Sequence, residues 1–326
     1  MKILSTIKSF LFADEGVQEP EPEPIVENLY EIQYLNSGSS GGKYKMSEIA
    51  EKVRNGKITR GNVTAAVSII VPYTDPVDGN TYDLPFMYGT VQTFEKEDGT
   101  TFTGLGLMTR YCIPNADVHF DAEETNNTEN ARRQQYGSNR WMHSGVRQWL
   151  NKSGLNWWTP QHEYDREHYK PVPKTVKGLL SCLPEDFVRA CVPVKMSTKT
   201  SSVDGGGYDI TYDKFFLLSM SQINIKITSS CGVKDESEGR YWELPRSEQG
   251  YSGYISSDYG NKKELVANSS RVKERVGSRT KCGYWTRSAY LSPVSNVWLV
   301  DSSGMVNGQY ARYPLSNGVI AACVIG

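Results

Sequence analysis

The spacing of apolar and polar residues changes along the chain, and the amino-terminal part shows three patterns in succession. Residues 1–12 carry apolar side chains at helical spacing, which predicts a short amphipathic docking helix. Residues 13–28, ADEGVQEPEPEPIVEN, alternate acidic groups with prolines. Because proline fixes φ and the carboxylates repel one another, this pattern predicts an extended spacer. Residues 36–42, NSGSSGG, predict a flexible joint.

Two later segments show the 3.6-residue period of an amphipathic helix. KMSEIAEKVRNGK predicts a helix with Ser47 as its N-cap and Gly56 as its terminating residue. SNRWMHSGVRQWLNKSG predicts a helix that begins near Asn139 and ends before Gly154. The apolar faces consist of Ile49 and Val53 in the first helix, and of Trp141, Val146, Trp149 and Leu150 in the second.

From about residue 60 the dominant pattern is that of short strands separated by turn residues. Residues 87–113 alternate on both sides of Asp98 and Gly99, which predicts a β-hairpin with these two residues at its tip. The other segments are a strand or two at 62–73, an exposed turn at 74–83, a buried strand at 213–225, and long loops with room for one short helix at 235–280.

These elements predict the domain organisation and the fold class. Residues 1–45 form the docking helix and spacer, and residues 46–326 form one domain. Many short strands with few helices indicate the α+β class, with short twisted antiparallel strands, one or two helices and long loops.

The composition argues against two classes of partner, nucleic acid and the membrane interior. The 36 Lys and Arg residues nearly balance the 37 Asp and Glu residues, so the chain has no basic face of the kind that binds nucleic acid. No run approaches the roughly 20 apolar residues that span a bilayer, so we expect no membrane insertion. The apolar segment near the start of the chain, ILSTIKSFLFA, is interrupted by Lys8 and lacks a small-residue cleavage site, which argues against a signal peptide.

Motifs for chemistry are weak. The six cysteines include no C-x-x-C pair, and we expect separately buried thiols rather than disulfides, with no metal and no cofactor. Gly38 to Gly42 formally match the G-x-S-x-G elbow but lie in a low-complexity joint. His162 and His168 are six residues apart and would not share a helix face as a zinc pair does, so we expect surface histidines. We therefore expect no enzymatic activity.

Four tryptophans admit two interpretations, a sugar-stacking platform or core, and we expect core because Trp149 has helical spacing. They are Trp141, Trp149, Trp157 and Trp158.

The last 43 residues, from Tyr284 to Gly326, contain only three charged side chains and are rich in Tyr, Trp, Ser, Asn and Gly. Tyrosine and tryptophan give a large contact area at low entropic cost, and the small polar residues give adaptable hydrogen bonds, as in antibody binding loops. The composition fits a ligand-binding face equally well as a pair of edge strands joined by polar turns.

The order of residues in three blocks favours the binding face. The blocks are SNRWMHSGVRQWLN (138–151), KFFLLSMSQI (214–223), and the tail YWTRSAYLSPVSNVWLVDSSGMV with NGVIAACVI (284–325). Their order resembles the carboxy-terminal half of a C-type lectin fold, in a phage and bacterial family of uncharacterised function. That family is related to formylglycine-generating enzymes and to phage major tropism determinants. Together with the hairpin, the resemblance covers about residues 50–326.

The chain also departs from these families. Ile320 and Ala321 stand where the family usually has Arg-Pro, so the final strand is expected to pack differently. No EPN or QPD triplet is present, so the resemblance does not imply calcium-dependent sugar binding. The paired active-site cysteines of the formylglycine enzymes are missing, so oxidase activity does not carry over.

The resemblance implies that the last strands present a solvent-facing surface for a ligand. Trp298, Val300 and Val306 would face inward, and the period of two turns their neighbours outward. The implied binding face comprises Tyr290, Ser292, Asn296, Leu299, Asp301, Met305, Asn307, Gln309, Tyr310, Arg312 and Tyr313.

We therefore expect a non-enzymatic phage virion protein, assembled in the cytoplasm of a bacterial host. Residues 1–45 would dock it to other virion proteins, and the lectin-like face would bind a host surface glycan or protein. A homo-oligomer is expected, with a trimer as one arrangement, since multivalency multiplies weak contacts. The alternative is a structural decoration or connector protein of the virion that binds no host ligand.

Overall fold

The computed structural model describes the chain from residue 26 onward, with gaps. The described residues are 26–34, 37–61, 67–116, 119–166, 176–223, 238–240, 242, 271–278, 280–290, 292–313 and 317–326. The expected docking helix at 1–12 and most of the expected spacer lie outside them, as does most of the loop region expected at 235–280.

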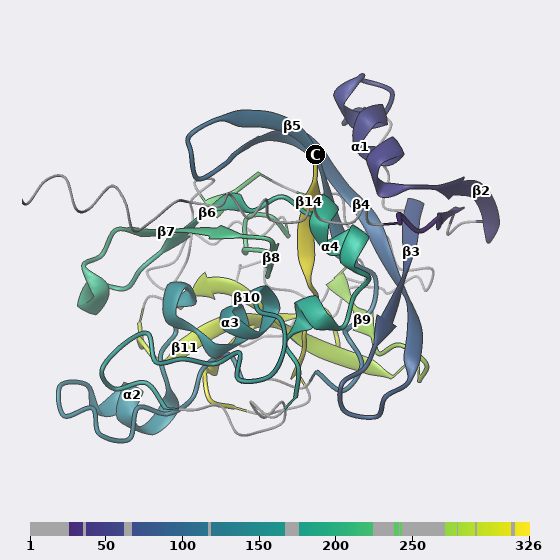
Figure 1. Cartoon of the computed structure of the whole chain (residues 1–326). Helices are drawn as coiled ribbons and strands as arrows, with labels where there is room; N and C mark the ends of the chain where they lie inside the picture. The colour runs from purple at the N-terminus through teal and green to yellow at the C-terminus, as the bar shows by residue number, and fades with distance from the viewer. Residues whose placement is uncertain are drawn as a thin grey trace, which may run out of the picture.

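Seven strands form the largest sheet, in the order β2-β1-β3-β4-β5-β14-β8 with all neighbours antiparallel (Figure 1). Their bounds are β1 Tyr30–Tyr34, β2 Ser39–Tyr44, β3 Val67–Thr74, β4 Thr81–Glu95, β5 Thr101–Thr109, β8 Phe215–Phe216 and β14 Ala322–Ile325. The carboxy-terminal strand thus lies inside the sheet that the first strands begin.

A second sheet has the order β12-β11-β10-β13, and β9 pairs with β10 off this path. Its strands are β9 Lys273–Glu274, β10 Lys281–Ala289, β11 Asn296–Val300, β12 Val306–Tyr310 and β13 Asn317–Gly318. A separate ribbon pairs β6 Val194–Lys199 with β7 Tyr208–Asp213. Among the described residues, β12 is an edge strand of the second sheet.

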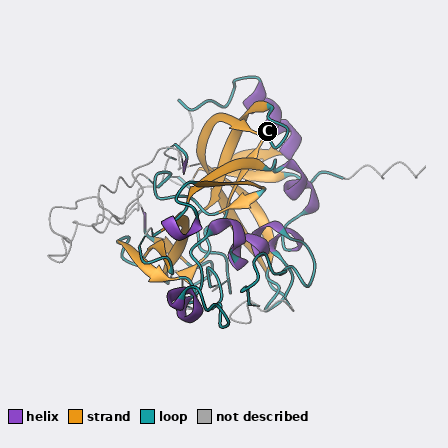
Figure 2. Ribbon diagram, turned by 90° about the vertical axis from the view of Figure 1, so that its left-hand side faces the viewer, coloured by secondary structure: helices purple, strands orange, loops and turns teal. Residues whose placement is uncertain are grey.

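The helices are short and lie around the strands (Figure 2). They are α1 Met46–Arg54, α2 Ala131–Tyr136, α3 Gly145–Asn151 and α4 Glu185–Ala190, with 3₁₀ turns at Trp141–His143, Leu179–Ser181 and Ser202–Asp204. The α+β class is confirmed, although the described residues include four α-helices where one or two were expected.

Helix α1 forms where the sequence predicts it, but Ser47 is not its N-cap. Lys45 occupies that position, and its backbone N–H donates to the Glu48 carboxylate at 2.8 Å, the return bond of a capping box. The hydroxyl of Ser47 instead donates to Glu27 at 2.7 Å. The carboxylate of Glu48, in the first turn, therefore accepts from the backbone at the start of the helix, and the side chain of Ser47 does not cap it.

The flexible joint expected at 36–42 is wrong for its second half. Residues from Ser39 onward form β2, which pairs with β1, and β1 pairs with β3 of the main sheet. The sheet therefore crosses the domain boundary expected between residues 45 and 46. Small polar residues form a strand here because the partner strand supplies the backbone hydrogen bonds.

The predicted hairpin is confirmed as β4 and β5. The chain reverses at Gly99, whose φ of +78° is readily adopted by glycine, and the N–H of Lys96 donates to the carbonyl of Thr100 at 2.8 Å. The alternation of the two strands sets their register, with Phe94 opposite Phe102.

The helix predicted from Asn139 is confirmed, but Ser144 interrupts it. A 3₁₀ turn precedes Ser144, whose hydroxyl then accepts from the N–H of Arg147 at 3.3 Å and caps α3. The tryptophans behave as core residues: Trp141, Trp149 and Trp157 are buried and Trp158 packs against the core.

The buried strand predicted at 213–225 is right about burial and wrong about conformation. Only Phe215 and Phe216 are in a strand, while Leu217 to Ile223 continue as buried irregular chain up to the end of this described range. The guanidinium of Arg287 donates to the Leu217 carbonyl at 3.1 Å, so a side chain satisfies backbone that a strand would have paired.

The expectation of separate thiols is wrong for one pair. Cys112 and Cys282 form a disulfide that joins the chain after β5 to β10. The thiols of Cys182, Cys191 and Cys323 are free and buried, and Cys231 lies outside the described residues. A spacing of 170 residues gave no signal, because only the packing of the two sheets brings these cysteines together.

Candidate functional site

The expected binding face is built on β11 and β12. In their register Trp298 is opposite Gly308 and Asn296 is opposite Tyr310, so these four residues share one face. Trp298, Val300 and Val306 are buried on this face, which confirms their inward orientation.

Leu299 is the buried exception among the residues expected to point outward, since it is only 5% exposed. Asn296 and Tyr310, also expected on the outward face, lie on the inward face with Trp298. Strand β11 lies between β10 and β12, and its second face, with Val297 and Leu299, is covered as well as its first. The period of two correctly placed Leu299 opposite Trp298, but it could not say that both faces are buried.

Tyr290 lies across β12 at Gly308. A Cβ added at Gly308 would come 2.7 Å from the Tyr290 ring, so glycine is what allows the ring to lie there. The same ring is 4.5 Å from the Trp298 ring, centroid to centroid. Tyr310 lies on the same face of β12, two residues and about 6–7 Å along the strand from Gly308.

The outermost part of this aromatic row is a stacked pair of tyrosines. The rings of Tyr310 and Tyr136 are 3.9 Å apart with an angle of 9° between their planes. Tyr136 is the last residue of α2, and its carbonyl accepts from the N–H of Arg312 at 3.0 Å. Both rings are half-buried.

Two arginines lie over the same ring. The guanidinium carbon of Arg312 is 5.5 Å from the centroid of the Tyr136 ring, and that of Arg132 is 5.9 Å away. We call Tyr136, Tyr310, Arg132 and Arg312 the tyrosine–arginine platform. A cation within about 6 Å of an aromatic ring is attracted by the ring quadrupole.

Helix α2 is held in place by its N-cap and by an ion pair of a residue within it. The side chain of Asn130 accepts from the N–H groups of Arg132 and Arg133, which caps the helix. Arg133 also forms an ion pair with Asp204 at 2.6 Å. Burial alone would raise the pKa of Asp204, but the hydrogen bond and charge of Arg133 bring it below its usual value.

The remaining residues of the expected face differ in exposure and in the face of the sheet on which they lie. Ser292 and Asn307 are exposed, Tyr313 is 37% exposed, and Met305 and Gln309 are half-buried. Asn307 and Gln309 alternate with Gly308 and Tyr310 and therefore lie on the opposite face from the platform. Asp301 is committed to its turn, because its carboxylate accepts from the N–H groups of Ser303 and Met305.

Sequence reasoning missed the residues that support the site from outside the tail. Asn139 is fully buried, and its amide donates to the carbonyls of Tyr290 at 2.8 Å and Asn296 at 2.9 Å. The spacing of Arg132 and Tyr136 places them one helical turn apart, which was a usable signal. The stacking of Tyr136 on Tyr310 left no signal in the sequence, because the two residues are 174 positions apart.

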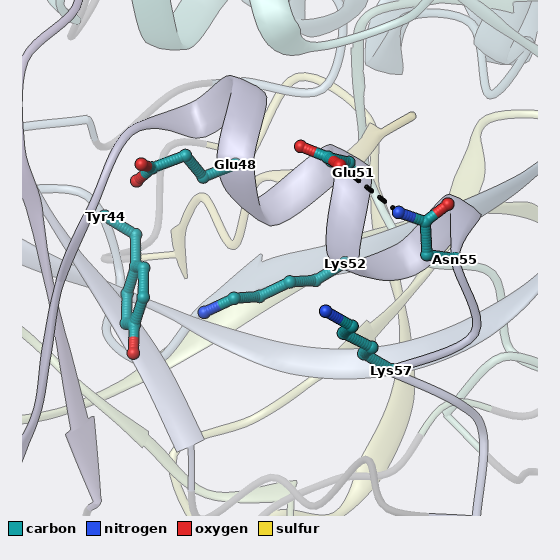
Figure 3. A pocket seen from close by; sticks show the side chains of 6 residues that line it. All are labelled: Tyr44, Glu48, Glu51, Lys52, Asn55 and Lys57. Atoms are coloured by element: carbon teal, nitrogen blue, oxygen red, sulfur yellow. Dashed lines mark hydrogen bonds between the residues drawn. The ribbon is translucent and has the colours of Figure 1, made fainter.

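A second candidate is a hollow of about 200 Å³ beside α1 (Figure 3). It is lined by Tyr44, Glu48, Glu51, Lys52, Asn55 and Lys57. The ammonium of Lys52 lies 3.2 Å from the centre of the Tyr44 ring. None of the lining residues belongs to the tail from Tyr284 to Gly326 that the sequence indicates, so the platform is the stronger candidate.

Groups suited to catalysis do not assemble around the residues the sequence raised. Ser40 lies exposed in β2 and its hydroxyl accepts from the N–H of Gly42. His162 is exposed, as expected, and stacks 6.1 Å from His143, whose pKa is lowered by burial and by Arg140. His168 lies outside the described residues.

Neither metal sites nor membrane spans were found in the described part of the chain. It contains no group of three or more His, Cys, Asp or Glu side chains that could hold a metal ion. Within the same residues no helix is both long and apolar enough to cross a bilayer.

Comparison with known proteins places the chain in a family without a described activity. No curated protein and no solved structure matches it. One family profile matches residues 107–325, about two thirds of the chain, and this span includes every strand of the second sheet and helix α2. The chain belongs to the family described as a domain of unknown function (DUF6273).

Proposed function

We propose that the chain is a non-enzymatic attachment protein of a phage particle. It carries a C-type lectin-like domain and binds a surface glycan of the host cell through the tyrosine–arginine platform. The observation that carries the proposal is the stacked pair of Tyr136 and Tyr310, which the fold holds half-buried beside the edge strand β12 of the second sheet.

Stacked, half-buried tyrosines with two arginines beside them suit a sugar ligand. Sugar rings present C–H groups that pack on an aromatic face, while the phenol hydroxyls remain available for hydrogen bonds. The ring pair is ordered before binding by the stack and by the backbone bond between Arg312 and Tyr136. Binding therefore loses little side-chain entropy, which favours affinity.

The fold-level part of the proposal draws on the resemblance of the three sequence blocks to phage and bacterial C-type lectin-like domains. One feature is compatible with it: β12 is the edge strand of the second sheet among the described residues, as a displayed binding face requires. Docking through residues 1–45 and assembly into a homo-oligomer, with a trimer as one arrangement, complete the proposal, since several weak faces together bind tightly.

The test is binding of the full chain to an array of bacterial and animal glycans. We expect Tyr310→Ala and Tyr136→Ala each to weaken binding at least 10-fold, because each removes half of the stack. Tyr111→Ala is the matched control, since Tyr111 is likewise half-buried with an arginine, Arg110, over its ring, and follows β5 instead of lying in α2 or β12. Binding that is unchanged in both platform variants, or lost equally in the control, would overturn the proposal.

One observation favours the alternative of a decoration or connector protein. The ribbon of β6 and β7 exposes apolar side chains: Tyr208 is 41%, Ile210 is 38% and the nearby Val203 is 57% exposed. Such a row suits contact with another subunit. If Ile210→Lys abolishes assembly with other virion proteins while the platform variants change nothing, the structural function is the correct one.

A further inference from the structure

We infer that the ligand of the platform is an acidic glycan, whose carboxylate or phosphate group is held by Arg132 and Arg312 beside a sugar ring on the tyrosine pair. This inference rests on the proposed function and specifies its ligand class.

The geometry gives both guanidinium groups one shared anchor. Arg312 follows β12 and Arg132 lies one helical turn before Tyr136, yet both are within 6 Å of the same Tyr136 ring. Tyr310 covers one face of that ring. A guanidinium carries several N–H groups in one plane, so two guanidinium groups near one ring can donate together to a carboxylate or phosphate.

The charge balance distinguishes these arginines from their neighbours. Arg133, Arg140 and Arg147 each pair with an aspartate at 2.6–2.7 Å. Arg132 and Arg312 form no ion pair with any residue in the described part of the chain. The platform therefore carries two positive charges that the described structure leaves without a counter-charge.

This arrangement selects among ligands. A cationic ligand would be repelled, and a neutral sugar would use the arginines as hydrogen-bond donors but leave their charges unbalanced. Nucleic acid needs an extended basic surface, and the chain as a whole carries a formal charge of −1. A compact anion attached to a sugar ring uses the two charges and the ring stack together.

The experiment measures binding of three polysaccharides to the full chain by calorimetry. The probes are oligogalacturonate for a carboxylate, a phosphomannan for a phosphate, and dextran as the neutral control. We expect one acidic probe to bind at least 10-fold more tightly than dextran, and the carboxylate and phosphate arms identify the source of the charge. Because the contact is electrostatic, raising the salt from 50 to 300 mM should weaken it several-fold.

The decisive variant is Arg132→Gln/Arg312→Gln, which removes both charges and keeps similar side-chain length. It should lose the preference for the acidic probe. Arg54→Gln is the control, because Arg54 is an exposed arginine on α1, at the other end of the molecule (Figure 1). Circular dichroism of both variants verifies that they fold.

Each other outcome is interpretable. If Tyr310→Ala abolishes binding of every probe while the double arginine variant binds like the wild type, the acidic-ligand inference fails and the glycan function stands. If neither acidic probe binds the wild type, the inference fails. If poly-glutamate binds through the arginines and no polysaccharide binds, the partner is an acidic protein, and both proposals are overturned.

Discussion

Removing the disulfide between Cys112 and Cys282 should lower the free energy of unfolding by more than the loss of the sulfur contacts alone would. The bond joins the end of the large sheet to β10, the strand on which β11 and β12 are built. The perturbation is the double variant Cys112→Ala/Cys282→Ala. Alanine is appropriate because both positions are buried, where a serine hydroxyl would need a partner.

The magnitude follows from the length of chain that the bond closes. The two cysteines are separated by 170 residues. Loop-closure entropy for that length corresponds to about 5 kcal/mol at 25 °C, which is an upper limit because unfolded chains retain structure. Observed losses for such bonds cluster at about 2–4 kcal/mol. Loss of the sulfur contacts themselves adds about 1 kcal/mol.

The assay is urea unfolding followed by fluorescence of the seven tryptophans. A loss of 2–4 kcal/mol should lower the midpoint by about 1 M, and the slope should rise because the unfolded chain without the cross-link exposes more surface. Cys182→Ala is the matched control, since it removes a buried free thiol and no cross-link. If the double variant unfolds at the same urea concentration as this control, the disulfide contributes no cross-linking stability and the reasoning is refuted.

Two further predictions concern buried polar groups. Burial and the nearby Arg110 lower the pKa of Lys273 from 10.5 to about 7. Between pH 7 and pH 10.5 the unfolded chain therefore binds more protons than the folded chain does. Lys273 thus makes the free energy of unfolding rise with pH over that range. Lys273→Met should be more stable than the wild type at pH 6 and should narrow that difference by pH 9 in urea titrations; a constant difference would contradict the shift. Asn139→Asp replaces an amide that donates to two buried carbonyls with a carboxylate that cannot, and should cost about 2–4 kcal/mol in thermal unfolding. It should also weaken glycan binding, whereas an unchanged melting temperature would show that these bonds do not support the site.

Local patterns determined the elements that depend on neighbours in sequence. The hairpin at Gly99, helix α1 and helix α3 follow from alternation, helical period and turn residues, and all three are present. The inward orientation of Trp298 also followed from the period of two. These features need only backbone geometry and the burial of one apolar face, and both are encoded within a few residues.

Tertiary structure alone decided the features that join distant segments. The pairing of Cys112 with Cys282, the strand formed by the glycines of β2, and the burial of Leu299 all depend on what packs against them. The same is true of the candidate site. The sequence indicated that the tail carries tyrosines for binding, but the stack of Tyr310 on Tyr136 and the arginines around it arise because the fold brings α2 against the end of β12. A side chain's period along the chain fixes its direction, while its neighbours in space are set by the packing of whole sheets and helices.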